Sequence, residues 1–391
     1  MKSVLATLNQ RFGILSNGIS LLGQTLLLGV ILYGAYYLLA TTQSNLLERG
    51  IESGFDFLGK EAGLPISDKL INYQPSDSYG YAFLVGILNT LLVSFIAIIL
   101  STILGVIVGV ARVSTNWIVS KIAAFFVETL RNVPLLLTLF FVYTLLLTTL
   151  PSVKRALNPF DGVFLSRRGL YIPEPMLMDG FGFVLAAFVI ALLIAYCFSR
   201  WAKSYQARTG YPLPRISISL AIILLLPLVV YFAMGSPLSF EIPVLKGFNF
   251  VGGITLKPEF SALLIGLVLY TSAYIGENVR SGLQSVSSGQ IEAANALGVP
   301  KSTIIRKVLL PQALRVIIPP TTNDYASLVK NSSLAVAIGY PDMVSIGGTI
   351  IGQNGQSIEI IAMWMAVYMT INLVISGLMN WLNVRVQIVE R

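Results

Sequence analysis

The chain has 391 residues, of which 55% are hydrophobic and 11% are charged. The charged share is about half that of an ordinary soluble domain. An all-soluble fold is therefore excluded, and several segments are expected in lipid. Histidine is absent and Cys197 is the single cysteine, which excludes an intrachain disulfide, a Cys/His zinc site and catalysis by a histidine-activated nucleophile. The net charge of +8 comes from short Lys/Arg clusters between apolar runs, so no nucleic-acid partner is expected. No metal site is expected either.

Eight apolar runs approach or exceed the ~20 residues that a membrane-spanning helix needs. The first is interpreted as a retained anchor, the fourth is short, and the seventh is interrupted by Pro319-Pro320. The sequence therefore predicts an all-α polytopic membrane protein with about eight transmembrane helices. The runs lie at about 19–41, 82–111, 122–150, 182–199, 216–235, 259–279, 309–338 and 358–382.

The orientation in the membrane follows from the distribution of charge. With the N-terminus inside, 16 of the 26 basic residues lie on the inner side and 11 of the 18 acidic residues lie on the outer side. The inverted arrangement would violate the positive-inside rule. Both termini are therefore predicted to be cytoplasmic.

Three outer segments, at about 42–81, 151–181 and 236–258, are longer than the ~2–8 residues that usually connect two helices. They are rich in Gly, Pro, Asp and Asn, which favours structured loops over long helices. Two interpretations remain open. The segments either pack over the helical bundle or form a docking surface for an extracytoplasmic partner.

A short helix is predicted in the cytoplasmic loop after the sixth span. Ser287 and Gln290 have the spacing of a capping box, Gly298 can end the helix in the left-handed conformation, and Pro300 suits the start of a second helix. The pattern alone fits either an ordinary loop helix or a rigid knob for a socket on another protein. Its small side chains, which allow close approach, are Ala293, Ala294 and Ala296.

Polar residues recur in the seventh apolar run. Asn323, Ser327 and Lys330 are spaced at i, i+4 and i+7, with Asp324 and Asn331 beside them, so they form one stripe on a helix. Such groups are costly in lipid and usually face a cavity or a partner. Either they line the pathway of a zwitterionic solute, Lys330 facing its carboxylate and Asp324 its ammonium, or an Asp/Lys pair and amide hydrogen bonds fix helix packing.

Two further acid–base pairs are predicted near the inner face. Glu277 with Arg280, and Glu128 with Arg131, are each spaced at i,i+3, where helical side chains are neighbours. They are interpreted as structural clamps or a gate.

The loop after the sixth span resembles that of a known family. Glu292-Ala293-Ala294, Gly298 and Leu310-Pro311 resemble the E-A-A-x-x-x-G…I-x-L-P loop of ABC importer permeases, with Val308 where isoleucine is usual. Several segments are similar to the histidine/glutamine/polar amino-acid branch of these permeases. They are residues 273–280, 310–313 and 329–334, and, upstream, Asn89-Thr90-Leu91 with Glu128, Arg131, Asn132 and Pro134. The first span and the region 151–258 resemble the larger general L-amino-acid permeases of the AapQ or BztB kind.

This resemblance implies a type I ABC importer-like permease core with an additional N-terminal span and a long middle insertion. It implies that the segment at about 288–298 is a coupling helix, which receives the conformational change of an ATP-binding subunit and passes it to a pathway for amino acids. The coupling residues that it implies are Glu292, Ala293, Ala294, Gly298 and Pro311.

The resemblance also implies the partners. These are a second homologous permease chain, in a heterodimer rather than a homodimer, two cytoplasmic ATP-binding subunits, and an extracytoplasmic solute-binding protein, at the inner membrane of a bacterium. ATP and Mg²⁺ would bind to the ATPase, because Lys301-Ser302 lacks the preceding glycine of a phosphate-binding loop and no G-x-x-x-x-G-K-[ST] motif occurs. No cofactor is expected in this chain, and the chain itself is expected to catalyse no reaction.

Four parts are expected along the chain: 1–80 with the first span, 81–150 as the first part of the core, 151–258 as an insertion with two spans, and 259–391 as the second part of the core. Two other functional classes remain. A secondary transporter could use Asp324 or Glu277 as an ion site, and an intramembrane enzyme would need a nucleophile or a carboxylate pair at membrane depth. Co-purification of an ATPase distinguishes the importer from the secondary transporter.

Overall fold

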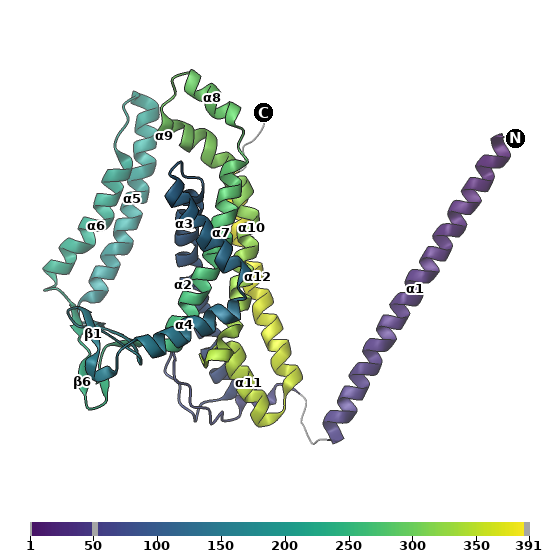
Figure 1. The fold of residues 1–391 in the computed structure, drawn as a ribbon, viewed down its shortest axis with the longest axis horizontal. Helices are drawn as coiled ribbons and strands as arrows, with labels where there is room; N and C mark the ends of the chain where they lie inside the picture. Colours follow the sequence, from purple (N-terminus) through teal and green to yellow (C-terminus); the bar gives the residue numbers. More distant parts are fainter. Residues whose placement is uncertain (1, 49–53, 387–391) are drawn as a thin grey trace. The chain divides into compact units, whose positions relative to one another are not determined.

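The computed structural model describes residues 2–48 and 54–386 (Figure 1). The chain forms two compact units. The first unit is Met1–Asn132 with Leu267–Arg391, and the second unit is Val133–Gly266. The chain begins with the helix α1 (Lys2–Glu48), which contains the candidate span Leu21–Thr42.

The remaining helices of the first unit form a bundle. In it, α10 packs against α2 and α12, α11 packs against α2 and α12, and α3 packs against α2. The helix α7 starts in the second unit and continues into the first. The bounds are α2 (Tyr79–Arg112), α3 (Trp117–Asn132), α7 (Pro258–Gln284), α8 (Ser288–Ala296), α9 (Lys301–Ile304), α10 (Leu310–Asn331), α11 (Met343–Asn354) and α12 (Ser357–Val386), with the 3₁₀ segments η1 (Asp56–Gly59) and η4 (Ser332–Ile338) and the π-helical turn η3 (Ile305–Leu309).

Glycines bring α2 and α7 unusually close together. A Cβ added at Gly105 would lie 2.7 Å from Cβ of Ile275, and one added at Gly109 would lie 2.5 Å from Cβ of Val279 and 2.6 Å from the carbonyl oxygen of Gly276. Small residues one turn apart allow two backbones to approach in the membrane, where association depends on packing rather than on exclusion of water. These glycines therefore set the distance between α2 and α7.

Residues 54–78, before α2, pack over one end of α2, α11 and α12. The side chains Phe57, Leu64 and Tyr73 are buried in a cluster with residues of these helices. The Tyr73 hydroxyl donates to the Leu64 carbonyl at 2.9 Å, and burial raises the pKa of this hydroxyl above its ordinary value. On α2, the Asn89 side chain donates to the Asp68 carbonyl at 2.8 Å. For this outer segment, the structure shows the packing that the sequence left open.

The second unit contains short β-strands that the sequence analysis did not predict. All pairs are antiparallel and form a four-stranded sheet in the order β1-β2-β3-β8 and the two-stranded sheets β4-β5 and β6-β7. Each strand has only three or four residues, too few for an alternating apolar pattern to stand out. The strands are β1 (Leu157–Phe160), β2 (Val163–Ser166), β3 (Gly169–Ile172), β4 (Glu174–Leu177), β5 (Leu238–Glu241), β6 (Val244–Lys246), β7 (Asn249–Val251) and β8 (Ile254–Leu256).

The helices of the second unit are α4 (Leu135–Thr149), the 3₁₀ turn η2 (Val153–Arg155), α5 (Phe181–Thr209) and α6 (Arg215–Ala233). α5 and α6 pack against each other. On α5 the buried side chains are alanines, and α6 buries none of its side chains. This pair therefore leaves most of its apolar surface exposed, as expected for helices that face lipid.

Within the described parts of the chain, six helices are long and apolar enough to cross a membrane, or up to eight if two broken helix pairs each count as one span. The predicted number of spans is therefore confirmed, but the predicted interruption at Pro319-Pro320 is wrong, and the third run has a break that was not predicted. The third run is divided at Val133-Pro134, because proline disfavours helical backbone in the preceding residue. The seventh run continues through Pro319-Pro320 and bends by 54° only between Ile338 and Met343.

Candidate functional site

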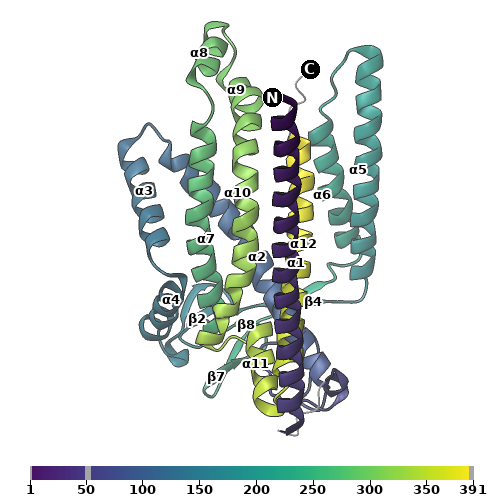
Figure 2. The same cartoon turned by 90° about the vertical axis from the view of Figure 1, so that its right-hand side faces the viewer.

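The helix α8 lies beyond the ends of α7 and α10 in both ribbon views (Figure 1; Figure 2). None of its residues is buried, and Glu292 and Ala293 are exposed. Leu297, which follows the helix directly, is 82% exposed. The surface of α8 therefore presents small side chains, with one large apolar side chain directly after the helix. The sequence analysis did not single out Leu297, because one leucine among alanines does not reveal its exposure.

The C-terminal end of α8 forms as predicted. Gly298 has φ +72°, the left-handed conformation, and the Val299 amide donates to the Ala294 carbonyl at 3.1 Å. The predicted capping box does not form, because the Ser287 side chain makes no capping hydrogen bond. Instead the Gln290 carboxamide accepts a hydrogen bond from Gln312 of α10 at 2.5 Å.

This bond ties α8 to the first turns of α10. Pro311 lies in the first turn of α10, where a missing backbone N–H is tolerated. Between α8 and α10 the chain forms α9 and the π-helical turn η3. A side-chain hydrogen bond and this short connection therefore join α8 to α10.

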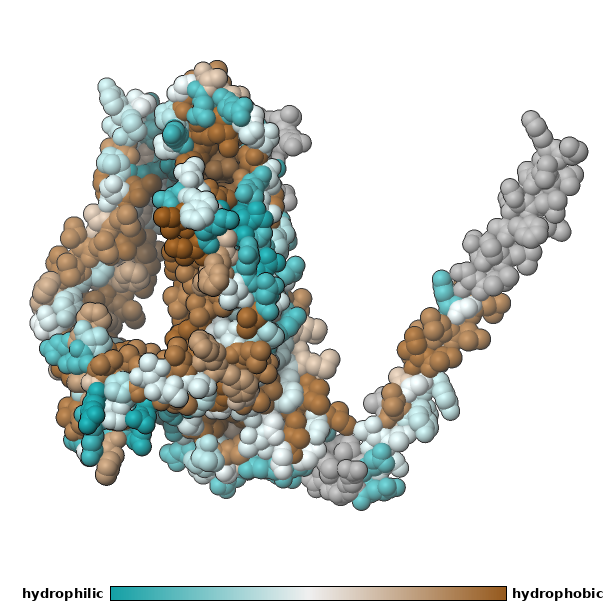
Figure 3. All heavy atoms as spheres, in the orientation of Figure 1, coloured by the Kyte–Doolittle hydropathy of each residue, from teal (hydrophilic) through white to brown (hydrophobic). Residues whose placement is uncertain are grey.

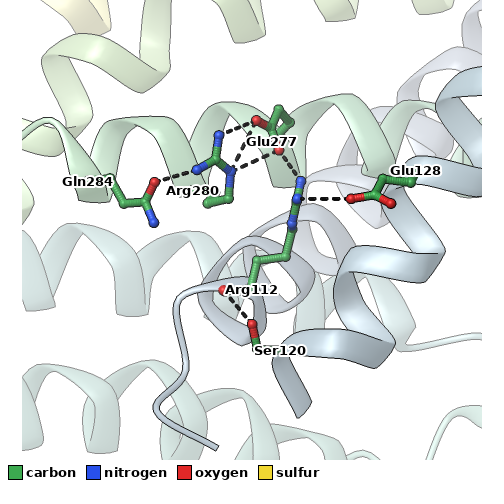
Figure 4. Close-up of polar contacts among 6 residues, drawn as sticks. All are labelled: Arg112, Ser120, Glu128, Glu277, Arg280 and Gln284. Carbon is green, nitrogen blue, oxygen red and sulfur yellow. Dashed lines mark hydrogen bonds and ion pairs between the residues drawn. The ribbon is translucent and has the colours of Figure 1, made fainter. Parts of the chain in front are cut away.

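A cluster of charged residues joins three helices at the end of α2 (Figure 4). The predicted pair is confirmed, since the Arg280 Nε donates to Glu277 at 3.0 and 3.1 Å. Arg112, the last residue of α2, also donates to Glu277, and the Gln284 side chain accepts from Arg280. Glu128 of α3 lies 3.8 Å from Arg112. Glu277 therefore accepts from two guanidinium groups and connects α2 with α7.

The second predicted pair is wrong in its partners. Glu128 approaches Arg112, whereas the Arg131 guanidinium carbon lies 5.2 Å from the ring centre of Tyr274, a cation–π contact. The i,i+3 spacing allows a pair between Glu128 and Arg131, but tertiary neighbours compete for both side chains. The contact between Arg112 and Glu277 has no local signal in the sequence, because the two residues are 165 positions apart.

A pocket of about 270 Å³ lies between α7 and α10. Asp324, Ser327 and Asn331 of the predicted stripe line it, so the structure brings these three together. The Asp324 carboxylate accepts from the Asn278 side chain at 2.6 Å. The wall from α7 includes Tyr270 and Tyr274, whose hydroxyl groups lie 3.1 Å apart. The full lining is Tyr270, Thr271, Tyr274, Asp324, Ser327, Leu328 and Asn331.

Asn323 and Lys330 do not line this pocket. Both are exposed, and the partner of Asp324 is Asn278 rather than Lys330. A helix turns by about 100° per residue, so the predicted stripe divides into a pocket face and an exposed face. Among the described residues, no group of three or more His, Cys, Asp or Glu is placed to hold a metal ion.

Comparison with known proteins decides the family. The family model "Binding-protein-dependent transport system inner membrane component" matches residues 201–388. The chain is 49% identical to the putative amino-acid ABC transporter permease protein YhdX of Escherichia coli K12, over 91% of each chain. The chain belongs to the amino-acid ABC transporter permeases.

Two other members of this family are similar over nearly their full length. The general L-amino acid transport system permease protein AapQ of Rhizobium johnstonii is 43% identical, over 93% of this chain and 91% of that protein. The glutamate/glutamine/aspartate/asparagine transport system permease protein BztB of Rhodobacter capsulatus is 37% identical, over 94% and 93%. The region 151–258 makes up more than a quarter of the chain, whereas each of the three alignments leaves out less than a tenth of the chain. Most of the insertion is therefore shared with these relatives. The predicted family and multi-pass inner-membrane character are confirmed.

Proposed function

We propose that this permease carries amino acids across the inner membrane and that α8 receives the conformational change of a separate ATP-binding subunit. The observation that carries the proposal is the exposed helix α8 with Leu297 at its end, closed by Gly298 in the left-handed conformation. A short helix with rigid ends transmits movement without bending, so it suits a contact that switches between two arrangements of a bundle. Glu292, Ala293 and Ala294 would face the partner.

The proposed complex contains a second permease chain, different from this one, two ATP-binding subunits under the cytoplasmic face and a solute-binding protein outside. ATP and Mg²⁺ would bind to the ATPase subunits. The positive-inside distribution supports cytoplasmic termini, and it supports a cytoplasmic position for the loop with α8, where the ATPase subunits would bind. The names of the relatives support amino acids as the substrate class.

The pocket between α7 and α10 is proposed as part of the amino-acid pathway. It offers the Asp324 carboxylate for an ammonium group, and the Ser327 and Asn331 side chains for hydrogen bonds. Arg131, which stacks on the pocket residue Tyr274, replaces Lys330 as the nearest proposed cation for a substrate carboxylate. Opposite charges around one polar pocket suit a zwitterion, since each substrate charge then keeps a partner after leaving water.

The test is co-expression with the ATPase and partner permease, followed by reconstitution and uptake of a panel of labelled amino acids. Gly298→Val forces a β-branched residue into the left-handed region, a strain of about 1–3 kcal/mol. Gly289→Val is the matched control, because Gly289 lies in the same exposed helix and has no positive φ. Gly298→Val and Glu292→Lys are expected to lower ATP-driven uptake or ATPase association at normal membrane insertion. Full uptake by both variants would refute the role of α8.

A further inference from the structure

Basic residues gather at one end of the sheet in the second unit. Lys154 and Arg155 lie in η2, directly before β1, and Arg167 and Arg168 form the turn between β2 and β3. Because β1 and β2 are antiparallel, the start of β1 and the end of β2 lie at the same end of the sheet. The four side chains are exposed there. We call them the outer basic cluster.

The turn between β6 and β7 adds an aromatic residue to this cluster. The Phe248 ring centre lies 5.0 Å from the Lys154 ammonium nitrogen, and the Arg168 Nη1 donates to the Phe248 carbonyl at 3.4 Å. Nevertheless Phe248 is 76% exposed. The hollow beside it has a volume of about 300 Å³, and Figure 3 shows hydrophilic atoms gathered over these strands. Its lining is Ser152, Val153, Lys154, Arg167, Arg168 and Phe248.

The outer basic cluster has no acidic partner in the described part of the chain. No ion pair joins any of its four residues to a carboxylate there. Asp161 lies in the turn between β1 and β2, at the opposite end of the sheet, and Glu174 pairs in register with Glu241 across β4 and β5. The sheet therefore has a positively charged end whose side chains form no ion pair within the described part of the chain, and such an end complements an acidic surface.

We propose that the outer basic cluster and Phe248 form a docking site for an acidic face of the solute-binding protein. The inference rests on the proposed function, which supplies that partner and places the strands outside, since one candidate span, α7, separates β8 from α8 along the chain. A carboxylate of the partner enters the hollow between Lys154, Arg167 and Arg168, where a guanidinium can donate two parallel hydrogen bonds. Phe248 packs against an apolar group beside it.

Two observations favour a protein over the headgroups of anionic lipids. The β6–β7 hairpin points away from α5 and α6 in both ribbon views, so its tip is directed away from the apolar surface of these spans (Figure 1; Figure 2). An exposed aromatic ring with arginines around it also has the composition of protein interface hot spots, whereas lysine and arginine alone suffice for lipid phosphates.

The experiment uses the complete transporter in nanodiscs of zwitterionic lipid and, as probe, the purified solute-binding protein that stimulates its ATPase. Binding of the probe is measured by surface plasmon resonance at about 20 and 500 mM salt, where the Debye length falls from ~20 Å to ~4 Å. Arg168→Glu and Phe248→Ala are compared with Arg208→Glu. This control makes the same charge change at an exposed residue near the end of α5, outside the cluster.

Arg168→Glu is expected to raise Kd about tenfold at low salt, through slower association and faster dissociation, and to lose the effect on association at high salt. Phe248→Ala should raise Kd at both salt concentrations, and Arg208→Glu should leave Kd unchanged. Equal binding by wild type, Arg168→Glu and Phe248→Ala would overturn the docking site. The proposal would also be overturned if Arg168→Glu left Kd unchanged but reduced the amount of co-purified anionic lipid. That result would show that the cluster binds lipid. If no solute-binding protein stimulates or binds the wild-type transporter, the proposed function itself fails.

Discussion

The contact between α2 and α7 predicts that Gly109→Ala destabilises the bundle. An added methyl group would lie 2.5 Å from Cβ of Val279 and 2.6 Å from the Gly276 carbonyl oxygen. Neither atom belongs to the free end of a flexible side chain, so the two helices must move apart. Overpacking of this kind costs about 1–3 kcal/mol, and it outweighs the ~0.5–1 kcal/mol that alanine gains over glycine inside a helix.

Gly377→Ala in α12 is the matched control, because an added Cβ there would meet no atom within 4 Å. The assay is the temperature at which half of the detergent-purified protein remains monodisperse, followed by size-exclusion chromatography of a fluorescent fusion. The net cost is then at most about 2.5 kcal/mol, and a shift of ~2–4 °C per kcal/mol predicts a decrease of up to about 10 °C for Gly109→Ala. Gly377→Ala should leave this temperature unchanged or raise it. A Gly109→Ala protein as stable as wild type would refute the close approach of α2 and α7.

Two further predictions concern charged residues in the bundle. Glu277→Gln should destabilise the fold by about 1–3 kcal/mol, because it leaves two partly buried guanidinium groups without their shared carboxylate. Glu128→Gln, whose side chain is 70% exposed, should cost less than about 0.5 kcal/mol. Chemical denaturation of both variants checks this order of stability. Asp324→Asn should lower amino-acid uptake in normally assembled complex, whereas Lys330→Met should retain uptake per assembled complex; the reverse order would contradict the assignment of the pocket.

The side-chain chemistry of the sequence determined the membrane class, the number of spans and the position of α8. Apolar runs specify helices in lipid whatever their neighbours are, because backbone groups there must pair within the helix. Gly298 followed by Pro300 ends α8 through local backbone preferences, which need no tertiary contact. The match of Glu292-Ala293-Ala294 and Leu310-Pro311 to a family loop identified the family that the comparisons confirmed.

The tertiary structure decided which polar side chains meet. The i,i+3 spacing predicted a pair between Glu128 and Arg131. In the structure Glu128 lies near Arg112 of α2, and Arg131 contacts the ring of Tyr274 of α7. For the same reason the polar stripe of the seventh run divides, since the position of α7 determines that Asp324 faces a pocket and Lys330 does not.

The strands show the same limit at the level of the backbone. A strand of three or four residues gains its stability from hydrogen bonds to a neighbour that can be distant in sequence, as β3 does with β8. Local preference therefore predicted loops for 151–181 and 236–258, and only the folded chain shows that these two segments pair. The outer basic cluster was present in the sequence as four residues on two separate loops. Their gathering around Phe248, 80 positions from Arg168, depends on that pairing.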